Sequence, residues 1–272
     1  MADEATSDCL FERLRLHQQR APDSTEVARA ITARINSRLT SHDKHVRQCT
    51  LEKLWNKQTG AIQMLLSILE TSRDVATSTY ITSILREALC LKQGKGKKCS
   101  VINDTSSSKK RECKKTGKEN VPPLSKKANN IARQQCCQHL ISLNGTQVML
   151  RTIITTHGKR DGNVGTELML HDLVWILAAL SPKDTKFAMK VRMLGCVRTM
   201  HLILKGHFTD NKLIFPLLVI MKQLAKNPVT TSILIRDGAI TTYERVLVSL
   251  GFIPTARLRL CLDAIDYFSK NS

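Results

Sequence analysis

Hydrophobic positions repeat four times along the chain in the same order after a glycine, at Gly60, Gly145, Gly195 and Gly238. The next residue is always small, namely Ala61, Thr146, Cys196 or Ala239. The fifth residue after each glycine is bulky, and the eighth and ninth residues are aliphatic. In chain order these residues are Leu65, Ile68 and Leu69, then Leu150, Ile153 and Ile154, then Met200, Ile203 and Leu204, and finally Tyr243, Val246 and Leu247. This spacing places the apolar side chains on one stripe of an α-helix.

A polar helix is expected before each glycine, at about residues 43–59, 128–144, 184–194 and 228–237. Each glycine then lies at a tight corner between two helices, where glycine reaches positive φ at no steric cost. A longer third helix is expected to close each unit, within residues 74–90, 163–180, 209–225 and 255–270. Asp74, Asp184 and Thr209 are the expected N-caps, because their side-chain oxygens can accept from free N–H groups of a first helical turn.

The spacing of the glycines indicates an insertion. Gly60 and Gly145 are 85 residues apart, whereas the later intervals are 50 and 43 residues. Residues 92–127 contain 12 Lys or Arg against 3 Asp or Glu and little apolar periodicity, so we expect this segment to be a disordered, mobile basic insertion. Without its 36 residues the first interval is 49, and all three intervals approach the roughly 40–47 residues of HEAT and armadillo repeats.

The pattern therefore predicts an all-α fold, an armadillo/HEAT-type α-solenoid of about four three-helix repeats. Alternating runs typical of strands are nearly absent. The expected division of the chain is an N-terminal helical cap, four repeats and the insertion, at residues 1–41, 42–91, 92–127 (the insertion), 128–182, 183–227 and 228–272.

Composition changes this picture little. The longest apolar stretches, LVWILAAL and LIFPLLVIM, are shorter than the roughly 18 residues of a membrane span, and the N-terminus lacks an apolar signal core. The nine cysteines form no Cys-x-x-Cys pair, which favours reduced thiols that pack between helices. We expect a cytoplasmic protein, with a nuclear location as the alternative.

Catalytic motifs are absent from the sequence. The eight histidines form neither His-x-x-Glu nor His-Glu-x-x-His, the spacings that hold zinc on one element. A phosphate-binding Gly-x-x-x-x-Gly-Lys-Ser/Thr loop and Gly-x-Ser-x-Gly are missing as well. We expect no cofactor, no metal and no enzymatic activity of this chain, and a binding surface instead.

The face of the third helices is the expected binding groove. Nuclear import adaptors of the armadillo type bind basic peptides there with ladders of Trp and Asn. In the corresponding alignment, only one of four positions is Trp and none is Asn, so an import adaptor is not expected. Trp175 either packs between repeats or contacts a partner, and Glu87, Gln223 and Asp263 would favour a partner with hydrogen-bond donors or basic groups. The candidate groove consists of Ser83, Glu87, Trp175, Ala179, Val219, Gln223, Asp263 and Tyr267.

The charge of the chain indicates a polyanionic partner. The formal net charge is +19, which attracts polyanions through long-range fields and counterion release. Acidic protein tails and nucleic acid both qualify, although few aromatics accompany the lysines, which weakens a nucleic-acid platform. KKRECKK (109–115) is compatible with a nuclear-localisation signal or with a plain spacer. The candidate polyanion-binding residues are Lys109, Lys110, Arg111, Lys114 and Lys115.

The order of several segments resembles the N-terminal armadillo-type region of the large cytosolic carboxypeptidases. These segments are STEVARAITARI, GAIQMLLSILETSRD, LSPKDTKFAMKVRMLGCV, NKLIFPLLVIMKQLAKNPVTTSILIRDGAI and LRLCLDAIDYFSK. The similarity covers about residues 24–91 and 128–272, with PKDTKF (182–187) the most specific part and the insertion without a counterpart.

That family removes glutamates from polyglutamylated tubulin, with a zinc site in a C-terminal domain. The ligands there include His-x-x-Glu and a later His, and no such positions exist in this sequence. The resemblance implies a non-catalytic module that positions a partner, with tubulin or an acidic glutamate-rich tail as that partner. Three alternatives remain open: a short isoform or fragment of a zinc metallocarboxypeptidase, a nuclear or nucleic-acid-binding adaptor that acts through the insertion, and an enzyme in its own right.

Overall fold

The computed structural model describes residues 2–20, 25–89, 126–158 and 163–271, which form α-helices joined by short turns. One 3-10 helix, η1 (Lys57–Thr59), precedes the first corner. The α-helices of these ranges are α1 (Ala2–Arg20), α2 (Thr25–Leu39), α3 (Lys44–Trp55), α4 (Ala61–Thr71), α5 (Val75–Ala88), α6 (Lys126–Ser142), α7 (Gly145–Gly158), α8 (Val164–Leu180), α9 (Phe187–Met193), α10 (Cys196–His207), α11 (Ile214–Ala225), α12 (Pro228–Arg236), α13 (Ala239–Leu250) and α14 (Ala256–Asn271).

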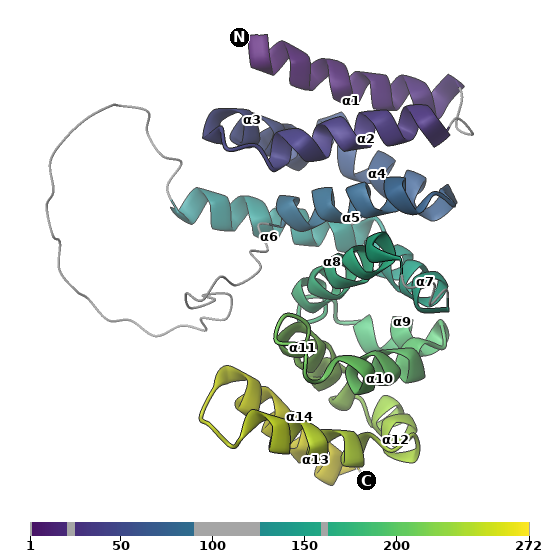
Figure 1. Cartoon of the computed structure of the whole chain (residues 1–272), viewed down its shortest axis with the longest axis vertical. Coiled ribbons are helices and arrows are strands. Elements are labelled where there is room, and N and C mark those ends of the chain that lie inside the picture. Colours follow the sequence, from purple (N-terminus) through teal and green to yellow (C-terminus); the bar gives the residue numbers. More distant parts are fainter. Residues whose placement is uncertain (1, 21–24, 90–125, 159–162, 272) are drawn as a thin grey trace, which may run out of the picture.

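The helices stack in chain order along one axis, from α1 to α14 (Figure 1). The third helix of each expected unit packs on the third helix of the next, so α5 contacts α8, α8 contacts α11 and α11 contacts α14. Helix α2 packs on α5 in the same way. The expected all-α solenoid is confirmed, while the division into repeats at the stated boundaries stays an interpretation.

The apolar stripe after each glycine forms the core. Leu65, Leu150, Met200 and Tyr243 occupy equivalent positions, and each is at most 1% exposed. Tyr243 also makes an edge-on contact with the ring of Phe268, 5.3 Å between centroids, a favoured geometry for aromatic pairs. One stripe position differs from the expectation, because Ile154 is 38% exposed. Helix α7 thus presents an apolar side chain to solvent where Leu69 and Leu204 are buried and Leu247 is partly buried.

The corners between first and second helices are left-handed, as expected, at Gly60, Gly195 and Gly238, with φ of 61°, 70° and 81°. At the remaining corner, the second along the chain, the predicted positive φ of Gly145 was wrong. Asn144 takes the left-handed conformation there, with φ of 57°, and Gly145 begins α7. Asn tolerates this region better than other side chains do, so the corner lies one residue earlier.

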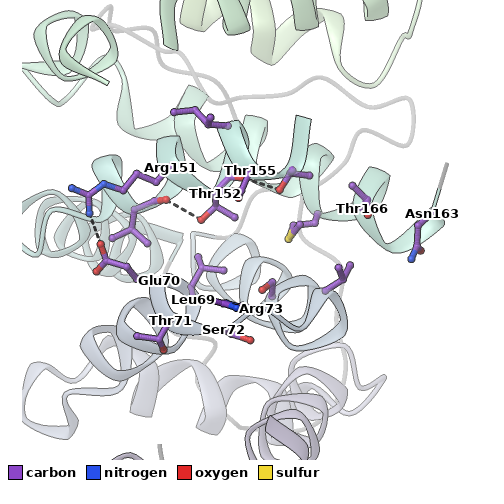
Figure 2. A pocket seen from close by; sticks show the side chains of 16 residues that line it. Leu69, Glu70, Thr71, Ser72, Arg73, Arg151, Thr152, Thr155, Asn163 and Thr166 are labelled. Carbon is purple, nitrogen blue, oxygen red and sulfur yellow. Dashed lines mark hydrogen bonds and ion pairs between the residues drawn. The ribbon is translucent and has the colours of Figure 1, made fainter. Parts of the chain in front are cut away.

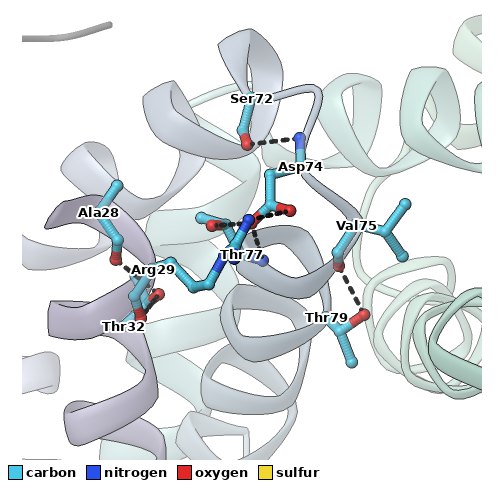
Figure 3. Close-up of polar contacts among 8 residues, drawn as sticks. All are labelled: Ala28, Arg29, Thr32, Ser72, Asp74, Val75, Thr77 and Thr79. Carbon is cyan, nitrogen blue, oxygen red and sulfur yellow. Dashed lines mark hydrogen bonds and ion pairs between the residues drawn. The ribbon is translucent and has the colours of Figure 1, made fainter. Parts of the chain in front are cut away.

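The N-cap predicted at Asp74 is confirmed, and the carboxylate does more than cap (Figure 3). It accepts hydrogen bonds from the backbone and the hydroxyl of Thr77, at 2.9 and 2.6 Å, and from Arg29 of α2, at 2.9 and 2.8 Å. Burial alone would raise the pKa of Asp74, but these bonds outweigh it and lower the pKa to about 2. The cap therefore also joins α2 to α5.

The other two predicted caps were wrong. Helix α9 begins at Phe187, and Asp184 instead accepts from the backbone N–H of Lys186 in the turn before it. Before α11 the side chain that accepts a backbone bond is Asp210, from Lys212, and not Thr209. Shorter helices than expected explain both cases, since α11 begins only at Ile214.

The basic insertion lies almost wholly outside the described residues, so its expected disorder and mobility stay predictions. Helix α6 begins at Lys126 and so includes the last two residues of the expected insertion.

Candidate functional site

The eight residues predicted for the groove all lie on α5, α8, α11 and α14, the helices that stack on one another. Seven of them are partly exposed, and Val219 is buried at 6%. We call this set the third-helix face: Ser83, Glu87, Trp175, Ala179, Val219, Gln223, Asp263 and Tyr267. The repeating stack thus places a half-exposed pair on each of α5, α8 and α14, and the half-exposed Gln223 beside the buried Val219 on α11.

Trp175 lies at the centre of this face against Phe215 of α11, with ring centroids 6.3 Å apart and an interplanar angle of 35°. Its ring therefore packs between two units. Its Nε1–H is buried and donates to no group in the described part of the chain. A buried donor without an acceptor costs about 1–3 kcal/mol. Because this nitrogen is buried, an acceptor of another molecule could reach it only after neighbouring side chains move.

The acidic side chains of the third-helix face are already paired. Lys222 of α11 contacts Asp263 of α14 at 2.6 Å. Arg86 contacts Glu87, on its own helix, at 3.2 Å, and Asp172 of α8 at 2.5 Å. This differs from the expectation that Glu87 and Asp263 would attract a basic partner, because each carboxylate has its cation within the protein.

Burial has a strong effect on Asp172. It raises the pKa of this carboxyl from 3.8 to about 6, and the hydrogen bond and charge of Arg86 compensate only in part. The Asp172 side chain is 6% exposed. The junction between α5 and α8 therefore contains a carboxyl that changes its charge close to neutral pH.

The PKDTKF motif forms a buried cluster between two units. Asp184 accepts from the hydroxyl of Thr146, at 2.9 Å, and from the Lys190 ammonium, at 2.7 Å. Asp184, Thr146 and Lys190 are all at most 8% exposed. The motif thus joins the start of α7 to α9, which is a structural role.

A second buried cluster was not predicted from the sequence. His201 of α10 bonds Asp237 through Nδ1, at 2.7 Å, and the hydroxyl of Thr242 through Nε2, at 2.8 Å. The order Asp, His, Thr is that of a nucleophilic triad. His201 and Thr242 are 2% and 4% exposed, however, so a substrate cannot reach the hydroxyl. These contacts instead join α10 to the corner between α12 and α13.

Metal and thiol chemistry find little support in the described residues. They contain no group of three or more His, Cys, Asp or Glu side chains placed to hold a metal ion. Cys136, Cys137, Cys196 and Cys261 are buried and form no disulfide. Burial raises the pKa of Cys196 to about 11 and that of Cys261 to about 12, which makes these thiols poor nucleophiles.

The five basic residues from Lys109 to Lys115 predicted to bind polyanions lie outside the described residues. Within the described ranges, no helix combines the length and the apolar character that crossing a bilayer requires.

The stacked helices and the row of half-exposed side chains define an α-solenoid repeat protein. A family model described as "CCP1-like, N-terminal TPR repeats" matches residues 5–272, and the chain belongs to this family. The resemblance to the N-terminal region of the large cytosolic carboxypeptidases is therefore confirmed. The family description names TPR repeats, whereas three helices lie between successive corners of this chain.

Curated relatives include cytosolic carboxypeptidase 1 of three vertebrates. The chain is 24% identical to the protein of Gallus gallus over 90% of its own length, 23% to that of Danio rerio over 94%, and 24% to that of Mus musculus over 92%. It spans only 16–18% of the length of these relatives.

Two engineered proteins are similar among solved structures. Each is 11% identical to this chain, with TM-scores of 0.49 and 0.47, and the matches cover 99% and 97% of this chain and 91% and 98% of the engineered ones.

Proposed function

We propose that this chain is a non-catalytic protein-interaction module that positions a partner for chemistry performed elsewhere. Membership of a family of N-terminal repeats carries the proposal. The third-helix face supports it, because a row of half-exposed side chains over four stacked helices is the usual binding surface of a solenoid. Trp175 supports it too, because its large aromatic ring is partly exposed on this face.

We propose further that the partner is acidic, with tubulin tails rich in glutamate as the candidate and the cytoplasm as the compartment. The net charge of +19 favours a polyanion. Lys109, Lys110, Arg111, Lys114 and Lys115 place five positive charges in seven residues. Their attraction to an acidic chain should depend strongly on salt, since the Debye length is about 8 Å at roughly 0.15 M ionic strength.

The test is a titration of the protein with a polyglutamate peptide at low and high salt. Replacement of these five residues by Ala is expected to weaken binding several-fold at low salt and to have little effect at high salt. A variant that exchanges each Lys for Arg and Arg111 for Lys keeps the charge, so it should bind like the wild type. Equal affinities of the wild type and the five-Ala variant at low salt would contradict the proposal.

The alternative is a nucleic-acid adaptor that uses the same basic residues. A single-stranded oligonucleotide with as many charges as the peptide separates the two readings in the same assay. Tighter binding of the oligonucleotide at equal salt would favour the adaptor, and tighter binding of the peptide would favour an acidic protein tail.

A further inference from the structure

A cleft of about 860 Å³ opens between the first two units, and none of the residues of the third-helix face lines it. Its walls come from the α4–α5 turn, from α7 and from the start of α8 (Figure 2). The ion pair between Glu70 and Arg151 stands at one end of the cleft and Asn163 at the other (Figure 2). The volume lies within the roughly 300–1,000 Å³ typical of ligand sites.

Three threonine hydroxyl groups of this cleft can accept hydrogen bonds, because their protons are already donated to backbone carbonyls. Thr152 donates its proton to the carbonyl of Val148, at 2.9 Å, and Thr155 donates to that of Thr152, at 2.9 Å. Thr71, on the opposite wall, donates to the carbonyl of Ser67, at 3.0 Å. A threonine hydroxyl has a single proton but two lone pairs. Each oxygen therefore remains available as an acceptor for an N–H group in the cleft.

Besides Arg151, which is paired with Glu70, the cleft offers the cation of Arg73 and an apolar lining. Arg73 is exposed and makes no hydrogen bond or ion pair within the described residues. The neighbouring Asp74 does not neutralise it, because Arg29 holds that carboxylate. Leu69, Val148 and Met169 line the cleft, together with the exposed Ile154.

We propose that this cleft binds an extended peptide segment in which an acidic side chain alternates with apolar ones. The backbone N–H groups of such a segment match the acceptor oxygens of the threonines, a carboxylate matches Arg73, and an apolar side chain covers the lining. A free phosphate or a nucleic-acid backbone fits less well, since Arg73 could receive it but it brings only further acceptors to the threonine oxygens. A basic peptide would meet Arg73 with like charge. The residues that line this site do not include any residue of the basic insertion, and the proposal goes beyond the proposed function.

The test uses a fluorescent, blocked peptide of alternating Glu and Leu, five residues long, titrated with the full chain. The same peptide with methylated backbone nitrogens keeps its charges and side chains but loses its N–H donors, and a Lys and Leu peptide reverses its charge. We expect the Glu and Leu peptide to bind and both analogues to bind at least tenfold more weakly. Failure of the unmethylated peptide to bind, or equal binding of the methylated one, would overturn the proposal.

Substitutions of residues that line the cleft test whether the peptide binds there. Thr152→Val and Thr155→Val keep the shape of the side chain and remove one acceptor each, so each should weaken binding about fivefold, in line with a single hydrogen bond. Arg73→Glu should reverse the preference between the Glu and the Lys peptide. Thr40→Val and Arg236→Glu are matched controls outside the cleft, and they should bind like the wild type. Unchanged binding in all three cleft variants, with melting temperatures like the wild type, would show that the cleft holds only solvent.

The five-Ala variant of the insertion separates this proposal from the previous one. It should bind the Glu and Leu peptide as the wild type does, whether or not its binding to polyglutamate is weakened. Loss of the Glu and Leu peptide in this variant would place the peptide on the insertion and overturn the cleft site.

Discussion

Asn144 and Gly238 both take the left-handed backbone conformation at their corners. The glycines at positions 238 and 145 differ in how much space a Cβ atom would find. At Gly238 nothing lies within 4 Å of where a Cβ would stand. At Gly145, just after the Asn144 corner, a Cβ would stand 2.8 Å from the backbone oxygen of Leu140. Glycine is thus needed for its φ at one corner and for its small size at the other.

Substitutions at these two glycines should separate the two reasons. Gly238→Ala should lower the free energy of unfolding by about 1–2 kcal/mol, the cost of a left-handed Ala, and Gly238→Asn should cost less because Asn tolerates this region. Gly145→Ala should cost about 1–3 kcal/mol, as overpacking does, and Gly145→Asn should give no relief. Urea unfolding measures all four. A Gly238→Asn variant as unstable as Gly238→Ala would contradict the conformational explanation.

At the scale of elements, polar side chains fix how neighbouring helices meet. Arg29 and Asp74 join α2 to α5, Arg86 and Asp172 join α5 to α8, and Lys222 and Asp263 join α11 to α14. Apolar stripes on helices can slide past one another at little cost, whereas a largely buried ion pair, such as that of Arg86 and Asp172, is satisfied in one register only. We therefore infer that this pair sets the register of α5 against α8, while the two more exposed pairs contribute less.

The junction of α5 and α8 should respond to pH. The pKa of Asp172 is raised to about 6 in the folded chain from an ordinary 3.8. The folded state therefore binds more protons than the unfolded state between these values, and this group adds stability as pH falls from 7 to 5. Asp172→Asn removes the effect. We expect the wild type to gain roughly 1 kcal/mol relative to this variant over that range.

Urea unfolding of both proteins at pH 7 and pH 5 measures this difference, and the shared contributions of other groups cancel. Asp74→Asn serves as a control of opposite sign. The pKa of Asp74 is lowered to about 2, so its contribution is present above pH 4 and is lost only as pH falls further towards 2. A stability difference between the wild type and Asp172→Asn that is independent of pH would rule out the raised pKa.

At the scale of the whole molecule, each unit contacts its neighbours and the chain has no single centre. Helix α14 packs on α11, α12 and α13, while α5 packs on α2 and α8. In such a stack stability is approximately a sum of unit terms and neighbour terms. Local damage at one end should therefore remain local.

Phe268→Ala tests this. Phe268 is 3% exposed, and the truncation of a buried Phe costs about 3–5 kcal/mol. Amide hydrogen exchange should become faster in α11, α13 and α14 and remain unchanged in α2 and α5. Phe252→Ala is the control, because that ring is 66% exposed. A uniform loss of protection along the chain would show a single cooperative core instead.

The repeating pattern was sufficient to predict the helices and their class. Helix α8 begins at Val164 and α14 at Ala256, each within a residue of the expected start. Periodicity reports which face of a helix is buried, and that is a local property. It failed where helix ends depend on contacts distant in sequence, as at Asp184, whose carboxylate is held by Thr146 and Lys190 rather than by a helix terminus.

The candidate sites also contain residues that the sequence pattern predicts and residues that depend on contacts distant in sequence. The residues of the third-helix face follow from their positions in the pattern, and so do Gly60, Gly195 and Gly238. The internal pairing of Glu87 and Asp263 does not, since the partner of Asp263 lies 41 residues away. The cluster of His201, Asp237 and Thr242 and the cleft beside Arg73 carry no sequence motif, because each forms only when two units stack.

The sequence by itself determined that this chain is a helical stack with a basic insertion, since the spacing of apolar residues and the count of charges are properties of the linear chain. Tertiary structure alone decided which charges are free. Several carboxylates on the helices, among them Asp74, Asp172 and Asp263, pair with a cation on a neighbouring helix. The cation of Arg73 has no such partner within the described residues, because the folded position of Arg29 gives it the adjacent carboxylate of Asp74. Coulomb energy depends on distance in space and on burial, and neither can be read from the order of residues.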